Sequence, residues 1–483
     1  MLWIAVCLPQ LPLEVHAAAD IALAVCEEHI EHVNAIAHRA GIGRGMRRAT
    51  ALALCPSLVL VARDFAKEQA ALEAVAMWAL QFTPNVSLLP PQQDRPSGVL
   101  LEVSGSLLLF GGLAAIERAL RHGLAAQSHV ARCASAPFAQ AAWLLARARD
   151  GLSVQHAADV RARLAPLPAW LLGPGKPHWD ALQGIGVTSI GDLAGLPRAG
   201  IARRFSAMLV DELDRAFGSR PDPRIWFTAP PIFDLKVELA ARVDSAEALL
   251  FAARRLIVQL SGWLASRHAA TCALTFTLVH EDRAPTVLPL QLADASNDEA
   301  RFVLLLREVL GQLRLVAPVY ELALCCEAVA PAPASSAQLF PAPQAQHEGL
   351  MRLLERLQAR LGRERVLQFV LCEDHRPECA FVAQAADSKG RRAPSATQAP
   401  ARPLWLLPQP LPIDERQHAP FYGSALTLVA GPERIEGGWW DGPWVARDYF
   451  VARDASDALL WIFRARAPDP RLRQGWYLHG RFG

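Results

Sequence analysis

Residues suited to binding phosphate are concentrated around residue 190. The segment Gly184-Ile185-Gly186 places an apolar residue between two glycines, and such a turn can direct backbone N–H groups at an anion. A contact of this kind holds a nucleic-acid phosphate without reading the bases. Arg198, Arg203 and Arg204 follow the turn and can neutralise further phosphates. We predict a sequence-independent DNA-binding surface here, although a solvated helix face explains any single arginine equally well.

A second candidate is a short peptide with two large apolar residues, Ser336-Ala337-Gln338-Leu339-Phe340. It lies in a stretch rich in Pro, Ala and Gln, a composition typical of linkers. Adjacent apolar side chains on an unstructured peptide can dock into a preformed hydrophobic groove. We predict that Leu339 and Phe340 are anchors for another protein, and that Ser336 and Gln338 flank them. The alternative is a tether that folds back on its own domain.

Aromatic residues gather near the C-terminus, where the last 80 or so residues contain six of the thirteen tryptophans. Such a segment is expected to fold into a small β-containing core. The alternative for some of these side chains is a surface position, and the candidates are Trp439, Trp440, Tyr449 and Phe450. The sequence alone does not separate core from interface.

Composition excludes several classes of protein. With 483 residues, of which 52% are hydrophobic, the chain has room for three or four domains. Its nine cysteines are odd in number and form no C-x-x-C pair, so we expect neither a disulfide framework nor a metal site, and no cofactor. Arg254 and Arg255 interrupt the best membrane-span candidate. We expect a soluble, cytoplasmic protein.

The pattern of apolar residues predicts an α+β protein of several domains. Strands are expected at 3–8, 99–103, 235–240, 273–279 and 319–326, and helices at 17–26, 65–80, 245–266 and 297–313. Short helices are expected between 170 and 219, where Gly-containing turns recur.

Several of these segments together resemble Y-family (lesion-bypass) DNA polymerases. Residues 41–56, which end in Leu54-Cys55-Pro56, resemble the fingers helix, and Leu101-Glu102-Val103-Ser104-Gly105-Ser106 resembles the palm hairpin that follows the catalytic acids. The turn at Gly184-Ile185-Gly186 resembles the thumb helix-hairpin-helix. The resemblance covers about the first 330 residues.

The resemblance also marks what is missing. The family's first metal-binding acid falls at the place of Cys7, and its two adjacent carboxylates fall at Ser97 and Gly98. Two-metal nucleotidyl transfer needs hard oxygen ligands, which these residues do not supply. The aromatic pair that checks the nucleotide sugar would fall near Leu11 and Pro12 and is absent too. We therefore expect no catalytic residue.

Beyond residue 330 the chain resembles the ImuB family, catalytically degenerate Y-family homologues of bacterial mutagenic-repair cassettes. The residues that carry this resemblance are 373–378, 431–442, 447–451, 460–463 and 476–480. It implies a nucleoid-associated adaptor in SOS-induced translesion synthesis, with Trp439, Trp440, Tyr449 and Phe450 as candidates for a partner-docking surface. It implies as partners DNA, the sliding clamp, an error-prone C-family DNA polymerase and an ImuA-like, RecA-related protein. Leu339 and Phe340 would then contact the clamp, although Ser336 stands where the bacterial motif has Gln.

The resemblance implies six regions. They are palm and fingers at 1–165, thumb at 166–230, a little-finger-like domain at 231–330, a linker at 331–348, a helix/strand segment with a second linker at 349–402, and a partner-interaction module at 403–483.

Two other functions stay open. One is an active, low-efficiency Y-family polymerase that uses relocated acids such as Glu14, Glu102 or Asp94. The other is a structure-specific DNA-binding protein without a clamp contact.

Overall fold

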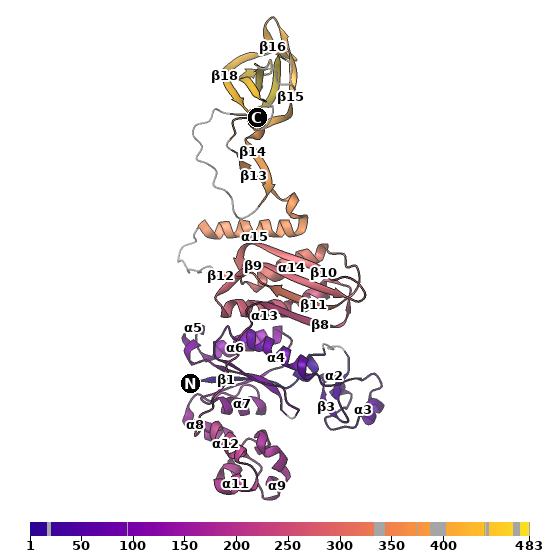
Figure 1. The fold of residues 1–483 in the computed structure, drawn as a ribbon, viewed down its shortest axis with the longest axis vertical. Coiled ribbons are helices and arrows are strands. Elements are labelled where there is room, and N and C mark those ends of the chain that lie inside the picture. The colour runs from indigo at the N-terminus through magenta and orange to yellow at the C-terminus, as the bar shows by residue number, and fades with distance from the viewer. Residues whose placement is uncertain are drawn as a thin grey trace. The chain divides into compact units, whose positions relative to one another are not determined.

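The computed structural model describes residues 1–16, 21–93, 95–332, 343–372, 374–386, 402–438, 440, 444–466 and 474–482. It divides into two compact units, Met1–Gly349 and Leu350–Gly483, and we describe each by itself (Figure 1).

The first unit is built on a four-stranded antiparallel sheet of order β5-β6-β1-β7. Its strands are β1 (Trp3–Leu8), β5 (Val86–Leu89), β6 (Ser97–Glu102) and β7 (Arg132–Ala136). β1 is buried at all six positions, which explains why it is a continuous apolar run. Helices α4 (Phe65–Ala79) and α6 (Leu113–Ala126) cover one face of the sheet, and α7 (Ala139–Ala148) covers the other. The short helices α1 (Leu11–Glu14) and α5 (Leu107–Phe110) follow β1 and β6.

A small three-stranded sheet is inserted between β1 and α4. It contains β2 (Leu23–Cys26), β3 (Ile30–Val33) and β4 (Val59–Val61), together with α2 (Ala35–Arg39) and α3 (Arg48–Leu54). The predicted helix at 17–26 is wrong where the structure describes it, because residues 23–26 pair with two strands. A buried apolar run this short has no periodicity that separates strand from helix.

Helices follow the palm-like sheet. They are α8 (Ala157–Leu164), α9 (Trp179–Gly184), α10 (Ile190–Gly195), α11 (Arg198–Arg204) and α12 (Ala207–Ala216). Ser189 caps α10, with its side chain accepting from the Asp192 N–H in a capping box. Apolar side chains of these helices join the same core as α7, so the helical segment is anchored on the sheet face that Cys7 also faces.

A second α/β layer completes the unit. Its sheet has the order β10-β9-β11-β8, with β12 (Ala330–Pro331) paired to β9. The elements are β8 (Phe233–Val243), α13 (Ala246–Ser266), β9 (Ala269–His280), β10 (Thr286–Ser296), α14 (Glu299–Gln312) and β11 (Val319–Cys326). β10 was not among the predicted strands. It contains Pro289 and lies at the edge of the sheet, the place in a sheet where proline is tolerated.

Among the described residues, α13 is the one helix long and apolar enough to cross a membrane. Arg254 and Arg255 therefore do not make this run too short or too polar to span a membrane, and the expectation that they do is wrong. Of the most apolar window, 61% is buried inside the protein, and α13 packs against α4, α14 and the strands of its own layer. These contacts are typical of a core helix.

The second unit contains α15 (Pro343–Leu361) from residue 350 onward, a hairpin of β13 (Leu367–Leu371) and β14 (Phe381–Ala385), and a seven-stranded antiparallel sheet. The order of this sheet is β17-β16-β15-β21-β20-β19-β18. Its strands are β15 (Trp405–Arg416), β16 (Ala419–Tyr422), β17 (Ser424–Ala425), β18 (Thr427–Gly437), β19 (Val445–Arg453), β20 (Leu459–Ala465) and β21 (Trp476–Arg481). Two aromatic-rich clusters fill it, which confirms the predicted folded, β-containing module and, with the first unit, the α+β class.

Candidate functional site

The three positions marked by the polymerase resemblance meet at one end of the first sheet. The antiparallel register of β1 and β6 places Cys7 opposite Gly98 and Leu8 opposite Ser97. Residues 89 and 91 positions apart in the sequence are thus neighbours, as the two halves of a two-metal site would have to be.

Gly98 is packed so tightly that it has no space for a side chain. A Cβ at this position would lie 2.3 Å from the Val6 carbonyl oxygen and 2.6 and 2.9 Å from Cζ3 and Cη2 of Trp143. Trp143 is on α7 and only 5% exposed. A carboxylate at residue 98 is therefore incompatible with this arrangement of α7 on the sheet.

Cys7 and Ser97 are poor ligands for a hard cation. Cys7 is 1% exposed, and burial raises the pKa of its thiol to about 12 despite the opposing charges of Arg147 and Arg132. The thiol therefore stays protonated at neutral pH. The Oγ atom of Ser97 is buried and has no hydrogen-bond partner in the described structure. The divalent ions that a Y-family fold implies would find no fitting donor set at these positions.

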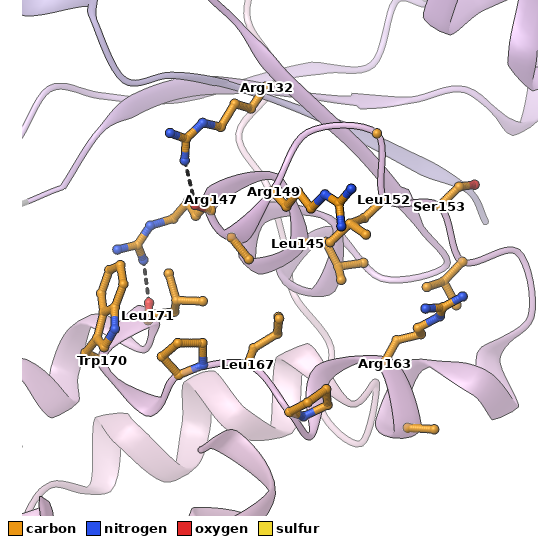
Figure 2. Close-up of a pocket in the computed structure, with 16 residues that line it drawn as sticks. Arg132, Leu145, Arg147, Arg149, Leu152, Ser153, Arg163, Leu167, Trp170 and Leu171 are labelled. Atoms are coloured by element: carbon orange, nitrogen blue, oxygen red, sulfur yellow. Dashed lines mark hydrogen bonds between the residues drawn. The ribbon is translucent and has the colours of Figure 1, made fainter. Parts of the chain in front are cut away.

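Two arginines lie at this end of the sheet, one of them beside Cys7. Arg132 is the residue of β7 that pairs with Cys7. Its Nη1 donates to the backbone oxygen of Arg147 at 3.2 Å, and the Arg147 guanidinium donates to the Leu171 oxygen (Figure 2). Burial lowers the pKa of Arg147. Trp143, Arg132 and Arg147 were not among the predicted site residues, since no motif indicates that Trp143 packs on Gly98 or that the two arginines act on Cys7.

The described relocated acids lie in structural roles. Glu14 accepts from the Val130 N–H at 2.7 Å and lies 2.7 Å from Nδ1 of His129. Glu102 pairs with Trp3, at the opposite end of β6 from Gly98, which is roughly 13 Å along the strand. Its side chain accepts from the Ser104 N–H at 3.1 Å. Asp94 lies outside the described residues.

The turn at Gly184-Ile185-Gly186 joins α9 to α10 and is exposed. Gly186 has a φ of +81°, a left-handed conformation that favours glycine. The expected free N–H groups are not found: Ile185 donates to Leu182 O at 3.2 Å and Gly186 donates to Gln183 O at 2.9 Å. That expectation is corrected for these two groups, because a phosphate here would have to compete with bonds that close α9.

The three thumb arginines differ in their surroundings. Arg198 begins α11 and forms an ion pair with Asp214 of α12, which offsets its charge. Arg203 and Arg204 lie in the last turn of α11 with exposed side chains. The guanidinium of Arg204 lies 5.7 Å from the ring centroid of Phe205. Arg203 and Arg204 are thus better placed than Arg198 to meet a phosphate.

The C-terminal candidates separate into core and surface. Tyr449 has 0% exposure and stacks on Trp461 with centroids 4.1 Å apart, so it has no surface with which to touch a partner, and we reassign it to the core. Phe450 is half-buried against Trp476 at 5.3 Å. Trp440 is 61% exposed, with Arg376 5.8 Å from its ring.

Two sets of predicted contacts cannot be placed. Trp439 and the candidate clamp-binding residues Ser336, Gln338, Leu339 and Phe340 lie outside the described residues.

The sequence matches one protein family and two curated proteins. Residues 14–146 match the impB/mucB/samB family (IMS). Protein ImuB of Caulobacter vibrioides (strain NA1000 / CB15N) is 30% identical over 481 residues, covering 92% of this chain and 100% of that protein. Protein ImuB of strain ATCC 19089 / CIP 103742 / CB 15 matches with the same values.

Solved structures resemble part of the chain. The crystal structure of DinB from Sulfolobus solfataricus is 15% identical, covers 69% of this chain and 100% of its own, and has a TM-score of 0.39. The insertion ternary complex of Dbh DNA polymerase is 16% identical, covers 67% and 98%, and also has a TM-score of 0.39. Because the 30% identity to Protein ImuB extends over the whole of that relative, the chain belongs to the ImuB family of Y-family polymerase homologues.

Proposed function

We propose that this protein is a non-catalytic Y-family polymerase homologue that acts as an adaptor in SOS-induced mutagenic translesion DNA synthesis. It binds primer–template DNA and the sliding clamp, and it recruits an error-prone C-family polymerase together with an ImuA-like, RecA-related protein. The observation that carries the proposal is the packing at Gly98, where Trp143 and the Val6 carbonyl fill the space of a metal-binding carboxylate.

The chemistry of the other two positions supports the same conclusion. A polymerase palm holds two divalent ions between carboxylates, and the ions stabilise the attacking and leaving oxygens. Here one position is a protonated, buried thiol and another is a buried hydroxyl. The guanidinium groups of Arg132 and Arg147 would also repel a cation near Cys7. The chemistry of synthesis is therefore assigned to the partner polymerase.

Primer extension tests the catalytic part of the proposal. Purified protein is expected to add no nucleotide to a primer–template in Mg²⁺ or Mn²⁺. The variants Glu14→Ala, Glu102→Ala and Asp94→Ala separate contamination from catalysis, because only intrinsic activity depends on them. Incorporation that disappears in one of these variants would establish the rival function, an active low-efficiency polymerase.

DNA binding is tested through its salt dependence. The double variant Arg203→Ala/Arg204→Ala is expected to weaken binding for all sequences and to reduce the slope of log K against log salt by about 2, at about 0.9 per phosphate contact. Arg118→Ala on α6, also an exposed arginine, is the matched control. An unchanged slope in the double variant would remove α11 from the DNA-binding surface.

The clamp contact is tested by a pull-down with purified sliding clamp. Leu339→Ala/Phe340→Ala is expected to abolish the interaction, since two adjacent anchors carry most of the energy of such a peptide. The control is Leu108→Ala/Leu109→Ala, a second apolar pair with 98% and 81% exposure. Retention by the first variant, or loss in the second alone, would refute the assignment to residues 336–340. A structure-specific DNA-binding protein without a clamp contact predicts that the clamp recovers not even the parent protein, and that Leu339→Ala/Phe340→Ala causes no loss of function.

The C-terminal module is the proposed docking site for the partner proteins. Deletion of residues 403–483 is expected to abolish recovery of the C-family polymerase and the ImuA-like protein from damaged cells while the clamp is still recovered. Trp440→Ala, at an exposed aromatic side chain, is expected to weaken the same recovery. Phe450→Ala serves as the comparison, because Phe450 packs inward on Trp476. Partner recovery from the deletion variant would place docking elsewhere.

A further inference from the structure

One cavity of the first unit lies beside the edge strand β7, and it takes no part in the proposed function. It has a volume of about 810 Å³, within the range of small-ligand sites. Its walls come from the end of α7, the segment that follows it, the end of α8 and the connection to α9, and every lining residue falls between Arg132 and Leu171. Figure 2 shows the lining side chains. The inserted fingers-like sheet contributes nothing to this cavity.

The cavity is lined by four arginines and by no carboxylate. The arginines are Arg132, Arg147, Arg149 and Arg163. In the view of Figure 2, Arg132 and Arg147 stand at one end, and Arg149 and Arg163 stand towards the other. A ligand lying between them would meet positive charge at both ends. Guanidinium groups bind phosphate through paired N–H donors, so phosphate is the anion that this lining favours.

The surrounding acids leave much of this charge uncompensated. Glu117 and Asp150 are engaged by Arg121 at 3.8 and 3.5 Å, and neither of them lines the cavity. Glu212 is the carboxylate that acts on Arg147, and Arg147 is also tied to the Leu171 oxygen. In the described part of the chain, Arg132, Arg149 and Arg163 form no ion pair.

One wall offers an aromatic surface as well. Trp170 lines the cavity and is 49% exposed, and Pro166, Pro168 and Leu152 line it too. A large apolar side chain that stays half in solvent beside arginines is suited to stacking on a base, since every base has an aromatic face. The combination of guanidinium groups and a tryptophan matches a nucleotide better than it matches an inorganic anion or an acidic peptide.

We propose that this cavity binds a nucleotide without a divalent metal ion, with the phosphates held by Arg149 and Arg163 and the base against Trp170 towards the other end. The fixed guanidinium charges neutralise the phosphates there, as divalent cations do for nucleotides in polymerases. The nucleotide is either a free nucleoside triphosphate or the 5′-phosphorylated end of a DNA strand. The site does not depend on the adaptor role, and its failure would leave the primer-extension and pull-down results unaffected.

Isothermal titration calorimetry on the full-length protein in EDTA tests the proposal with three probes. They are dATP, a 5′-phosphorylated trinucleotide and inorganic triphosphate. We expect dATP or the trinucleotide to bind, with Mg²⁺ giving no increase in affinity. Tighter binding of dATP identifies the free nucleotide as the source, and tighter binding of the trinucleotide identifies the strand end.

Three variants localise the binding. Arg149→Glu/Arg163→Glu is expected to weaken every probe at least about tenfold, because two charge-assisted contacts become repulsive. Trp170→Ala is expected to weaken dATP and the trinucleotide but to leave inorganic triphosphate unchanged. Arg161→Glu is the matched control: it lies on the same helix, but its guanidinium stacks on Phe217 at 5.1 Å and does not line the cavity.

Four results would overturn the assignment. They are no binding of any probe, binding that requires Mg²⁺, equal loss in Arg161→Glu and the double variant, and binding of a polyglutamate peptide in place of all three probes. Unchanged thermal midpoints of the variants ensure that a loss of binding is not a loss of folding.

Discussion

Gly98→Ala adds a single methyl group and tests whether Val6 and Trp143 leave any space for a side chain at residue 98. The new Cβ of Gly98→Ala meets three atoms closer than 3.0 Å, and one of them is the backbone oxygen of Val6, which cannot rotate away. Overpacking of a core costs about 1–3 kcal/mol, and a contact with backbone belongs at the upper end. We expect a loss of about 3 kcal/mol. At about 2 °C per kcal/mol for a large domain, the thermal midpoint falls by roughly 6 °C.

The assay is thermal unfolding of the full-length protein followed by circular dichroism, with Gly105→Ala as the matched control. Gly105 follows the same strand, and its added Cβ would have no atom within 4 Å. The control is expected to be neutral or slightly stabilising, since alanine restricts the unfolded chain. Equal midpoints for the two variants would refute the packing argument.

The same substitution in a Trp143→Leu protein tests whether the Trp143 side chain is what excludes a Cβ at residue 98. Two of the three close atoms belong to its ring, so Gly98→Ala should cost at least about 1 kcal/mol less when Trp143 is already leucine. The cost should not vanish, because the Val6 oxygen remains. An unchanged cost in the Trp143→Leu background would mean that the strand pairing, and not α7, excludes a side chain at residue 98.

Three further predictions concern titration and capping. Burial raises the thiol pKa of Cys7 and Cys133 to about 12, so pulse alkylation at pH 8 with mass spectrometry should label exposed Cys272 long before either of them. Ser245→Ala removes the side chain that caps α13 and should cost about 1 kcal/mol in thermal stability, whereas Ser245→Asp should not. Burial lowers the pKa of His479 from 6.5 to about 4, so the unfolded state takes up a proton that the folded state does not as pH falls from 6.5 to 4. Stability is lost in that window, and urea unfolding of His479→Gln should show a shallower decline than the parent protein.

Much of the fold could be predicted from the sequence because its elements carry strong local signals. The helices at 65–79 and 246–266 have caps at Asp64 and Ser245, and the strand at 3–8 is a continuous apolar run that ends before a proline. Prediction failed where those signals are absent. β10 carries a proline in its middle, and the run at 23–26 is too short to show a period.

The candidate site could be located but not characterised from the sequence. The resemblance indicated Cys7, Ser97 and Gly98, and the pairing of β1 with β6 brings them together. Nothing local relates Trp143 to Gly98, since that contact depends on how α7 lies on the sheet. In the same way, Tyr449 and Phe450 are adjacent in the sequence, and only the paired sheet decides that Tyr449 is buried in one core cluster.

The degenerate positions and the cavity beside β7 share positively charged side chains, because Arg132 and Arg147 act on Cys7 and also line the cavity. In a two-metal palm, carboxylates hold the divalent ions, and those ions in turn attract phosphate. Here the carboxylates are replaced by uncharged residues, and arginines contribute positive charge directly, at Cys7 and along the cavity wall. We therefore expect attraction for phosphate to persist without a cation to activate a hydroxyl group for attack. The two proposals together predict that this palm holds nucleic acid or nucleotide in EDTA and leaves bond formation to another polymerase, a combination that a mildly impaired polymerase would not show.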